Sequence, residues 1–349
     1  MAYTTIDDPG QHFKTVIYTG DGNDGRTVTG VGFQPDWVWI KGRSESEHHT
    51  LNDSVRGANK QVYSHLGYSE ATDTDRLQSF DSDGFTLGTD VIVNKNSETF
   101  VSWNWKLADS NANNTDGDIN SVVRANTTSG VAIVTYTGNA TSGQAIGHGL
   151  GIAPKFVTMK NRDQADDWII FTNAIDGSMD YIQGGWQSTG TKQDSGLDVP
   201  TTSVFDVHSD SYQNATGEDY VAYCIAPVKG FSKIGVYKGN NNADGNFVYL
   251  GFTPEWVLIK DTASGQSWHI IDTVREPFND GDAAHLIPNS NNSEAAAKTN
   301  RGTAAIDFLS NGFKIRSDAS LLNGTGTLLY IAFASAPFVN SKGVPANAR

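Results

Sequence analysis

The chain has 349 residues, a formal net charge of −14 at pH 7 and a single cysteine, Cys224. Acidic and basic residues are interspersed, which argues against nucleic acid or an anionic membrane surface as a partner, because neither would find a basic patch. The lone cysteine excludes intrachain disulfides, so stability must come from packed cores, bound ions or oligomerisation.

The first twenty residues carry Asp7, Asp8 and Pro9 where a signal peptide needs an apolar core. No later stretch approaches the roughly 20 consecutive apolar residues of a membrane-spanning helix. The sequence therefore predicts a soluble protein that is made in a cytoplasm and does not insert into a membrane.

A repeated order of motifs begins at residue 15. Each copy opens on a β-branched run with tyrosine and glycine, continues through a proline to an apolar block ending on lysine, and closes on an aromatic run. The opening runs are residues 15–20, 133–138 and 234–239, the apolar blocks 36–41, 155–160 and 255–260, and the closing runs 100–105, 220–225 and 330–335. So many ordered matches indicate three diverged copies of one unit.

Aromatic and β-branched residues dominate these runs, and glycine-rich turns separate them, which is typical of short strands. We predict an all-β fold of three tandem β-sandwich repeats, jelly-roll or lectin-like, although the pattern does not separate these from an immunoglobulin-like sandwich. The only good helical stretch is 293–298. The predicted organisation is a first repeat at 1–109, a linker at 110–130, a second repeat at 131–230, and a third repeat with a short C-terminal tail at 231–349.

No nucleotide-binding loop, hydrolase elbow or cysteine-rich metal motif is present, so we predict no catalytic residue. One cluster of carboxylates is a candidate calcium site, because loop oxygens are the ligands that calcium prefers. The cluster consists of Asp73, Asp75, Asp81 and Asp83. The alternative is that these residues cap turns through their own backbone. The third copy has Leu309 in place of Asp81, which favours the turn interpretation, and no other cofactor is predicted.

Two further groups of polar residues occur at matching places. His49 stands where the other copies have Trp168 and Trp268, which favours a packing role over metal binding. The pairs Asp53–Arg56 and Asp272–Arg275 recur in the first and third copies, and we expect each to form a local salt bridge or to face a partner.

Most aromatic residues lie on the repeated strands and are expected in the core. Four lie outside the shared runs, where an exposed ring would stack on a sugar or pack against another subunit. These candidate ligand-binding residues are Tyr63, Tyr68, Trp186 and Tyr212.

Several blocks resemble a family of tailed-bacteriophage proteins that is common in marine phages. They are residues 1–9, 32–41, 79–88, 306–314 and the segment from Pro337 to the end of the chain. The resemblance covers essentially the whole chain. It implies a virion protein, often labelled as tail-fibre-like, and carries no catalytic or ligand residues over to this sequence.

The sequence and the resemblance together predict a virion structural protein on the particle surface, made in the cytoplasm of the bacterial host. A tail-fibre or receptor-binding component is the first hypothesis, with other virion proteins and a host-surface glycan or protein receptor as partners. A capsid decoration or head-fibre protein is the alternative, and a polysaccharide depolymerase is a third hypothesis. We expect no enzyme activity, and a homo-oligomer is compatible with the sequence.

Overall fold

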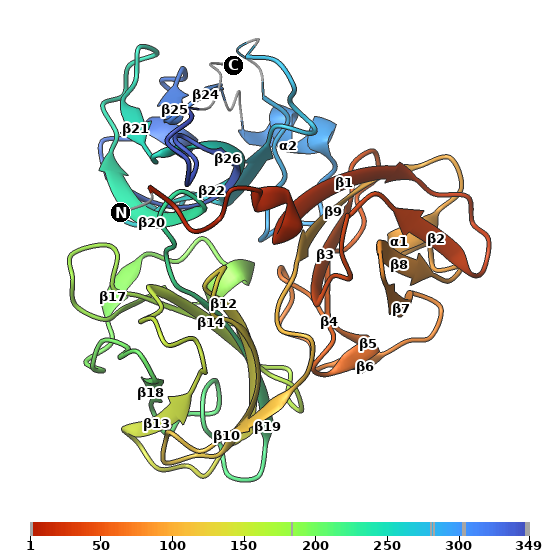
Figure 1. The fold of residues 1–349 in the computed structure, drawn as a ribbon, viewed down its shortest axis with the longest axis vertical. Helices are drawn as coiled ribbons and strands as arrows, with labels where there is room; N and C mark the ends of the chain where they lie inside the picture. The colour runs from red at the N-terminus through yellow and green to blue at the C-terminus, as the bar shows by residue number, and fades with distance from the viewer. Residues whose placement is uncertain (1–2, 183, 280, 282, 302–304, 346–349) are drawn as a thin grey trace.

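A computed structural model of the protein describes residues 3–182, 184–279, 281, 283–301 and 305–345. The chain is nearly all β, with every sheet antiparallel, which confirms the predicted fold class. Figure 1 shows three lobes around a common centre, one for each repeated segment. We call them the first unit (residues 3–109), the middle unit (110–230) and the third unit (231–345).

Each unit has a large sheet and a small sheet. In the first unit the large sheet has the order β1 (Phe13–Thr19), β9 (Thr99–Trp105), β3 (Trp37–Gly42), β4 (Thr50–Asp53), β5 (Gly57–Val62), β6 (Ala71–Thr72). Its small sheet has the order β2 (Arg26–Thr29), β8 (Gly84–Leu87), β7 (Leu77–Asp81). A 3-10 turn, η1 (Pro9–Gln11), and a short helix, α1 (Val91–Asn94), complete it.

The middle unit repeats this plan with a longer large sheet. The order is β10 (Ala112–Asn114), β11 (Ser121–Asn126), β12 (Val131–Thr137), β19 (Asp219–Ile225), β14 (Phe156–Asn161), β15 (Ile169–Thr172), β16 (Asp180–Ile182), β17 (Lys192–Asp194). The small sheet consists of β13 (Gln144–Gly147) and β18 (Val204–Val207), and η2 (Gly185–Gln187) follows β16.

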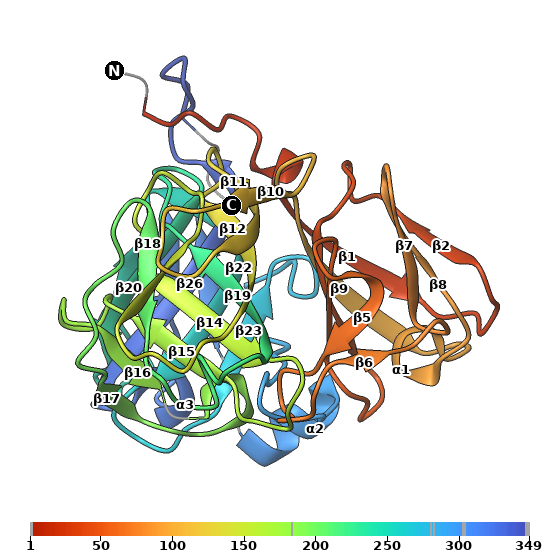
Figure 2. The same cartoon turned by 90° about the horizontal axis from the view of Figure 1, so that it is seen from below.

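The third unit has the large-sheet order β20 (Ser232–Lys238), β26 (Thr327–Pro337), β22 (Phe252–Asp261), β23 (Trp268–Asp272). Its small sheet is β21 (Phe247–Tyr249), β25 (Gly312–Ile315), β24 (Ile306–Leu309). Two helices belong to it, α2 (Glu294–Arg301) and α3 (Ser320–Asn323). The helical stretch predicted at 293–298 is therefore confirmed, and α2 lies at the same end of the molecule as β5 and β6 (Figure 2).

The large sheets bury both faces, which explains why their strands are apolar throughout. In β3, Trp37 and Trp39 point to the centre of the molecule, whereas Val38 and Ile40 point to the small sheet of the same unit. The three inner faces meet in one central core that includes Trp37, Phe156 and Trp256 at matching positions. Because successive strand residues alternate between faces, one strand serves two cores at once.

Residues 110–130 are not the linker that the sequence predicts. They contain β10 and β11, which extend the large sheet of the middle unit beside β12. The polar composition of this segment reflects its position at a sheet edge, where most of its side chains are exposed or half-buried. An edge strand needs few apolar residues because only one side of it packs.

The tyrosine and glycine of the opening motif have one role in every copy. The hydroxyl groups of Tyr18, Tyr136 and Tyr237 donate to the carbonyl oxygens of residues 93, 213 and 322, at 2.8, 2.6 and 2.5 Å. A Cβ on the glycine two residues later would lie 1.7–2.2 Å from a backbone carbonyl oxygen in each copy. The motif therefore fixes the turn after β8, β18 or β25 onto the opening strand.

A closed ring of hydrogen bonds joins the three units at one sequence position. The indole Nε1 of Trp168 donates to the Tyr63 carbonyl in the first unit at 2.7 Å. That of Trp268 donates to the Gly185 carbonyl in the middle unit at 3.1 Å. His49 completes the ring, because its Nε2 lies 3.1 Å from the Ile287 carbonyl in the third unit. The ring nitrogen Nδ1 of His49 accepts from Trp39, so Nε2 carries the proton.

The packing role predicted for His49 is thus what the structure shows. The residue is fully buried, and burial shifts its pKa well below the ordinary value. It remains neutral at physiological pH, because a charged imidazole would lose its hydration without gaining a counter-ion.

A second closed ring consists of backbone hydrogen bonds between units. The amides of Glu70, Lys192 and Glu294 donate to the carbonyl oxygens of Arg162, Thr262 and Arg43, at 2.8, 2.8 and 2.9 Å. Two of the three contacts also carry a bidentate ion pair, Arg162 with Glu70 and Arg43 with Glu294. At the third contact, Lys192 stands in place of the glutamate and Thr262 in place of the arginine, so the Glu–Arg ion pair is absent there.

The predicted local salt bridges are present at these two interfaces. Arg56 lies 2.6 Å from Asp53 and 3.0 Å from Glu70, and its side chain is fully buried. Arg275 makes the same contacts with Asp272 and Glu294, at 2.6 and 3.0 Å. Each aspartate also accepts from the next unit, Asp53 from the Tyr223 hydroxyl and Asp272 from the Trp103 indole. The interpretation as local salt bridges is therefore confirmed, and both pairs lie at interfaces between units of the same chain. Contact of these pairs with another molecule stays a prediction.

Each apolar block ends on a buried lysine. The ammonium groups of Lys41, Lys160 and Lys260 donate to the carbonyl oxygen of the next residue at 2.5–2.6 Å. Burial lowers the pKa of Lys41 to about 7 and the pKa values of Lys160 and Lys260 to about 8. Lys41 and Lys160 also donate to the carbonyl oxygens of Glu45 and Gln164, at 3.3 and 3.0 Å, and so hold the loops after β3 and β14 onto the large sheets.

We predict that stability rises with pH above neutrality. Between its folded pKa of about 7 and its unfolded value, Lys41 binds more protons in the unfolded chain, so the free energy of unfolding increases by up to about 1.4 kcal/mol per pH unit. Urea unfolding of Lys41→Met across this range should give a shallower rise than the unchanged protein. Lys155→Met, at an exposed position, serves as the control. Identical slopes for the protein and Lys41→Met would contradict the prediction.

Candidate functional site

The middle unit differs from the other two in its small sheet. That sheet has two strands, β13 and β18, whereas the first and third units add β7 and β24 as a third strand. The described residues 195–203, which precede β18, form no strand in its place. Part of the outer face of β15 and β16 therefore lacks the cover that a third strand supplies in the other copies.

The turn after β18 differs as well. In the first and third units the equivalent turn is a short helix whose apolar pair fills the core, Ile92 and Val93 or Leu321 and Leu322. The middle unit has Tyr212 and Gln213 at these positions. Two polar side chains therefore replace apolar ones next to the part of β15 and β16 that no third strand covers.

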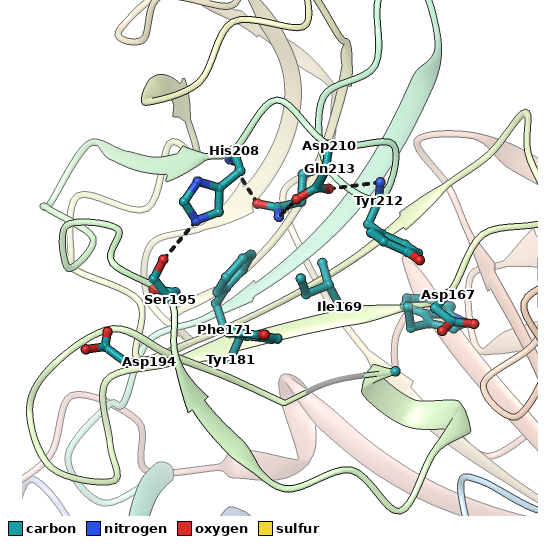
Figure 3. Close-up of a pocket in the computed structure, with 12 residues that line it drawn as sticks. Asp167, Ile169, Phe171, Tyr181, Asp194, Ser195, His208, Asp210, Tyr212 and Gln213 are labelled. Carbon is teal, nitrogen blue, oxygen red and sulfur yellow. Dashed lines mark hydrogen bonds between the residues drawn. The ribbon is translucent and has the colours of Figure 1, made fainter.

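These two differences create a pocket of about 370 Å³. It is lined by Asp167, Trp168, Ile169, Phe171, Tyr181, Gly184, Asp194, Ser195, His208, Asp210, Tyr212 and Gln213. Figure 3 shows side chains of the turn after β18 facing side chains of β15 and β16 across it. The volume lies within the range of small-ligand sites, which combine apolar walls with a few placed polar groups.

Hydrogen bonds fix the polar side of the pocket (Figure 3). The carboxylate of Asp210 accepts the backbone amide of Tyr212 at 3.0 Å and the side-chain amide of Gln213 at 2.7 Å. Nε2 of His208 donates to the Ser195 carbonyl at 2.9 Å, which ties the turn to the loop after β17. The polar groups are thus held in place before any ligand arrives.

The opposite side is apolar and aromatic. Ile169 and Phe171 lie on β15 and are almost fully buried, so they form the floor. Tyr181 on β16 is half-buried, and its hydroxyl donates to Gln193 at 2.6 Å. Tyr212 is 39% exposed at the rim, where its ring remains accessible to a ligand.

The pocket is acidic. Its lining contains three aspartates and no lysine or arginine. Burial raises the pKa of Asp210, because a half-buried carboxylate loses hydration, although its hydrogen bonds oppose the shift. The site therefore presents hydrogen-bond acceptors and negative charge to whatever enters it.

The four aromatic residues singled out from sequence have different fates. Tyr212 lines the pocket, and Tyr68 is 58% exposed in the first unit, outside the pocket. Trp186 is buried in the central core, and Tyr63 is buried with its hydroxyl accepting from Arg76. The expectation of an exposed ring is therefore wrong for Trp186 and Tyr63. Trp186 lies in η2 and Tyr63 in a loop, and both segments pack between units.

The four aspartates considered for calcium do not form a ligand shell. Asp73 accepts the amide of Asp75, Asp81 accepts two side-chain hydroxyls of its own hairpin, and Asp83 accepts two amides of a neighbouring loop. Within the described part of the chain, no group of three or more His, Cys, Asp or Glu side chains is placed to hold a metal ion. The contacts match the turn-capping interpretation.

Sequence reasoning missed most of the pocket. Asp210 and His208 lie in a polar segment without a recognisable motif, and Phe171 lies outside the runs that the three copies share. A signal existed in the comparison of copies, because the middle copy lacks the Phe–Gly–Phe pattern of the third strand and its hairpin. That absence marks the place where the middle unit lacks its third small-sheet strand.

The fold and the site define an all-β protein of three packed units with a ligand-sized pocket in one of them. The chain belongs to the family described as "Domain of unknown function (DUF7483)", which matches residues 8–337. No curated protein and no solved structure matches the chain. None of the helices in the described residues is both long and apolar enough to span a membrane.

Proposed function

We propose that this protein is a structural component of a phage particle surface and attaches the particle to its host. The observation that carries the proposal is the pocket beside β15, β16 and the turn after β18, at the place where the middle unit lacks the third small-sheet strand of the other two. A scaffold of three packed units that presents such a site is consistent with an attachment role. The sequence resemblance to tailed-phage proteins supports the virion setting.

The way the units are joined also suits a particle surface. The three units share one core, two closed rings of hydrogen bonds and buried ion pairs, and no flexible linker separates the first unit from the middle one. A molecule built in this way resists local unfolding, because each unit is packed against the other two and does not unfold independently. A protein exposed outside the cell benefits from this resistance to proteolysis.

Adsorption of the purified protein to cells tests the proposal. The fluorescently labelled full chain should bind bacteria that the parent phage infects, and unlabelled protein should compete with it. Resistant bacteria that have lost their surface polysaccharide are the matched control. Absence of binding to every permissive strain would contradict an attachment role.

A capsid decoration protein is the second candidate, and the threefold arrangement of the units favours it. Three similar faces around one axis would match a threefold site on a shell. Gold labelling of the protein on intact particles separates the two functions, since label on the tail supports attachment and label on the head supports decoration. New reducing ends after incubation with host polysaccharide would instead indicate the depolymerase hypothesis.

A further inference from the structure

We propose that the pocket of the middle unit binds a sugar that carries no negative charge, either a neutral or an amine-bearing saccharide unit. The inference rests on the proposed attachment function and names the chemical class of its ligand. Of the residues that line the pocket, the sequence analysis singled out Tyr212 alone, because the site arises where the middle copy departs from the other two.

The shape and walls of the pocket fit a sugar ring. Its volume of about 370 Å³ accommodates a small ligand, and its floor of Ile169 and Phe171 excludes water from one face of it. Tyr212 and Tyr181 supply aromatic faces, and the negative face of such a ring attracts the positively polarised C–H groups of a pyranose. An aromatic rim above an apolar floor suits a flat, partly apolar ring edged with hydroxyl groups.

The polar atoms of the pocket are mainly acceptors. Carboxylate oxygens of Asp167 and Asp210 accept hydrogen bonds, and sugar hydroxyl or ammonium groups donate them. Asp194 lies opposite Asp180, on the same face of β17 as Lys192, so its carboxylate does not point into the pocket. Asp210 is oriented by Tyr212 and Gln213 at 3.0 and 2.7 Å, so it does not have to be ordered when the ligand binds. Orientation before binding reduces the entropic cost of association.

The charge of the pocket selects against acidic sugars. No lysine or arginine lines the pocket. Lys192 on β17 is near it but pairs with Ile182 on β16, whose side chain belongs to the central core. Lys192 is therefore on the face of the sheet that is turned away from the pocket. Lys192 is also engaged by Asp176 and Asp180. A carboxylate or phosphate on the ligand would meet the like charges of Asp167 and Asp210 without a lysine or arginine to offset them, which disfavours that class of ligand.

Three trisaccharides of equal length separate the classes. The full chain is titrated with the N-acetylglucosamine trimer (neutral), the glucosamine trimer (amine-bearing) and the galacturonic acid trimer (anionic), and binding is measured by calorimetry at low salt. At least one of the first two should bind, and the anionic trimer should bind about tenfold more weakly or not at all. Preferential binding of the anionic trimer, or binding of none of the three, would overturn the inference.

Two variants assign the binding to this pocket. Tyr212→Ala should weaken binding about tenfold, whereas Tyr68→Ala, at an exposed tyrosine outside the pocket, should leave it unchanged. Asp210→Asn keeps an acceptor for the turn but removes one negative charge. The ratio of the affinity for the amine-bearing trimer to the affinity for the anionic trimer should therefore fall about fivefold. Unchanged binding in Tyr212→Ala would place the sugar elsewhere and overturn the proposal.

The two proposals fail in different ways. If the unchanged protein adsorbs to host cells and Tyr212→Ala adsorbs equally well, attachment stands and the pocket is not its ligand site. If the unchanged protein does not adsorb but binds the neutral or amine-bearing trimer through Tyr212, the ligand class stands and host attachment is wrong.

Discussion

Replacing Trp186 by alanine is expected to lower the free energy of unfolding by about 3–5 kcal/mol, among the largest effects of any single substitution in this protein. The ring is 2% exposed and belongs to the middle unit. Its centroid lies 5.5 Å from that of Trp39 in the first unit and 4.9 Å from that of Trp268 in the third. One side chain therefore packs against all three units.

Because of this position, Trp186→Ala should destabilise the molecule as a whole and not the middle unit alone. Guanidinium unfolding, followed by tryptophan fluorescence and by far-ultraviolet circular dichroism, should show one coincident transition at a lower midpoint. Tyr68→Ala is the matched control, since its ring is exposed and its loss should change stability by less than about 0.5 kcal/mol. Separate transitions for one unit and the remainder would show that the central core does not couple the units.

Arg275→Ala is expected to cost about 3–5 kcal/mol as well, for an electrostatic reason. The guanidinium is fully buried between Asp272 and Glu294, and it lies over the ring of Trp103 at 5.6 Å. Its removal leaves the buried carboxylate of Asp272 without its cation, whereas Glu294 keeps its pair with Arg43. The penalty comes mainly from the uncompensated charge of Asp272.

Two controls make the Arg275 prediction specific, with urea unfolding as the measurement. Arg56→Ala removes the equivalent cation at the other ion-paired interface and should have a similar cost. Arg316→Ala breaks pairs with Asp244 and Asp307 at the surface and should cost at most about 1 kcal/mol. Equal small effects in all three variants would mean that the buried pairs contribute nothing beyond ordinary surface ion pairs.

The middle-to-third interface provides an internal comparison. It keeps the backbone hydrogen bond of the other two interfaces but has Lys192 and Thr262 where they have glutamate and arginine. The stability of this interface depends on the apolar core and on hydrogen bonds such as that from Trp268 to Gly185. The Glu–Arg ion pair is thus present at two of the three interfaces, whereas at the third the middle unit has Lys192 in place of the glutamate and the third unit has Thr262 in place of the arginine.

Several features followed from the sequence by itself. The order of motifs established three copies, the strand character of each run, and the equivalence of His49 with Trp168 and Trp268. These features are local, because hydrophobic alternation and turn chemistry act over a few residues. The Asp–Arg pairs were recognisable for the same reason, since their partners are three residues apart.

Other features depended on the tertiary structure. The burial of Trp186 and Tyr63 and the two rings of hydrogen bonds involve contacts between segments that are far apart in the sequence, and no local pattern encodes them. The strands within 110–130 pair locally, but their polar composition conceals them until the neighbouring sheet is known. The pocket depended most on the fold, because it arises from a strand that one copy does not form. Comparison of repeated sequences shows what the copies have in common. The pocket left by the missing third strand is defined only by the neighbouring strands, which come together in the tertiary structure.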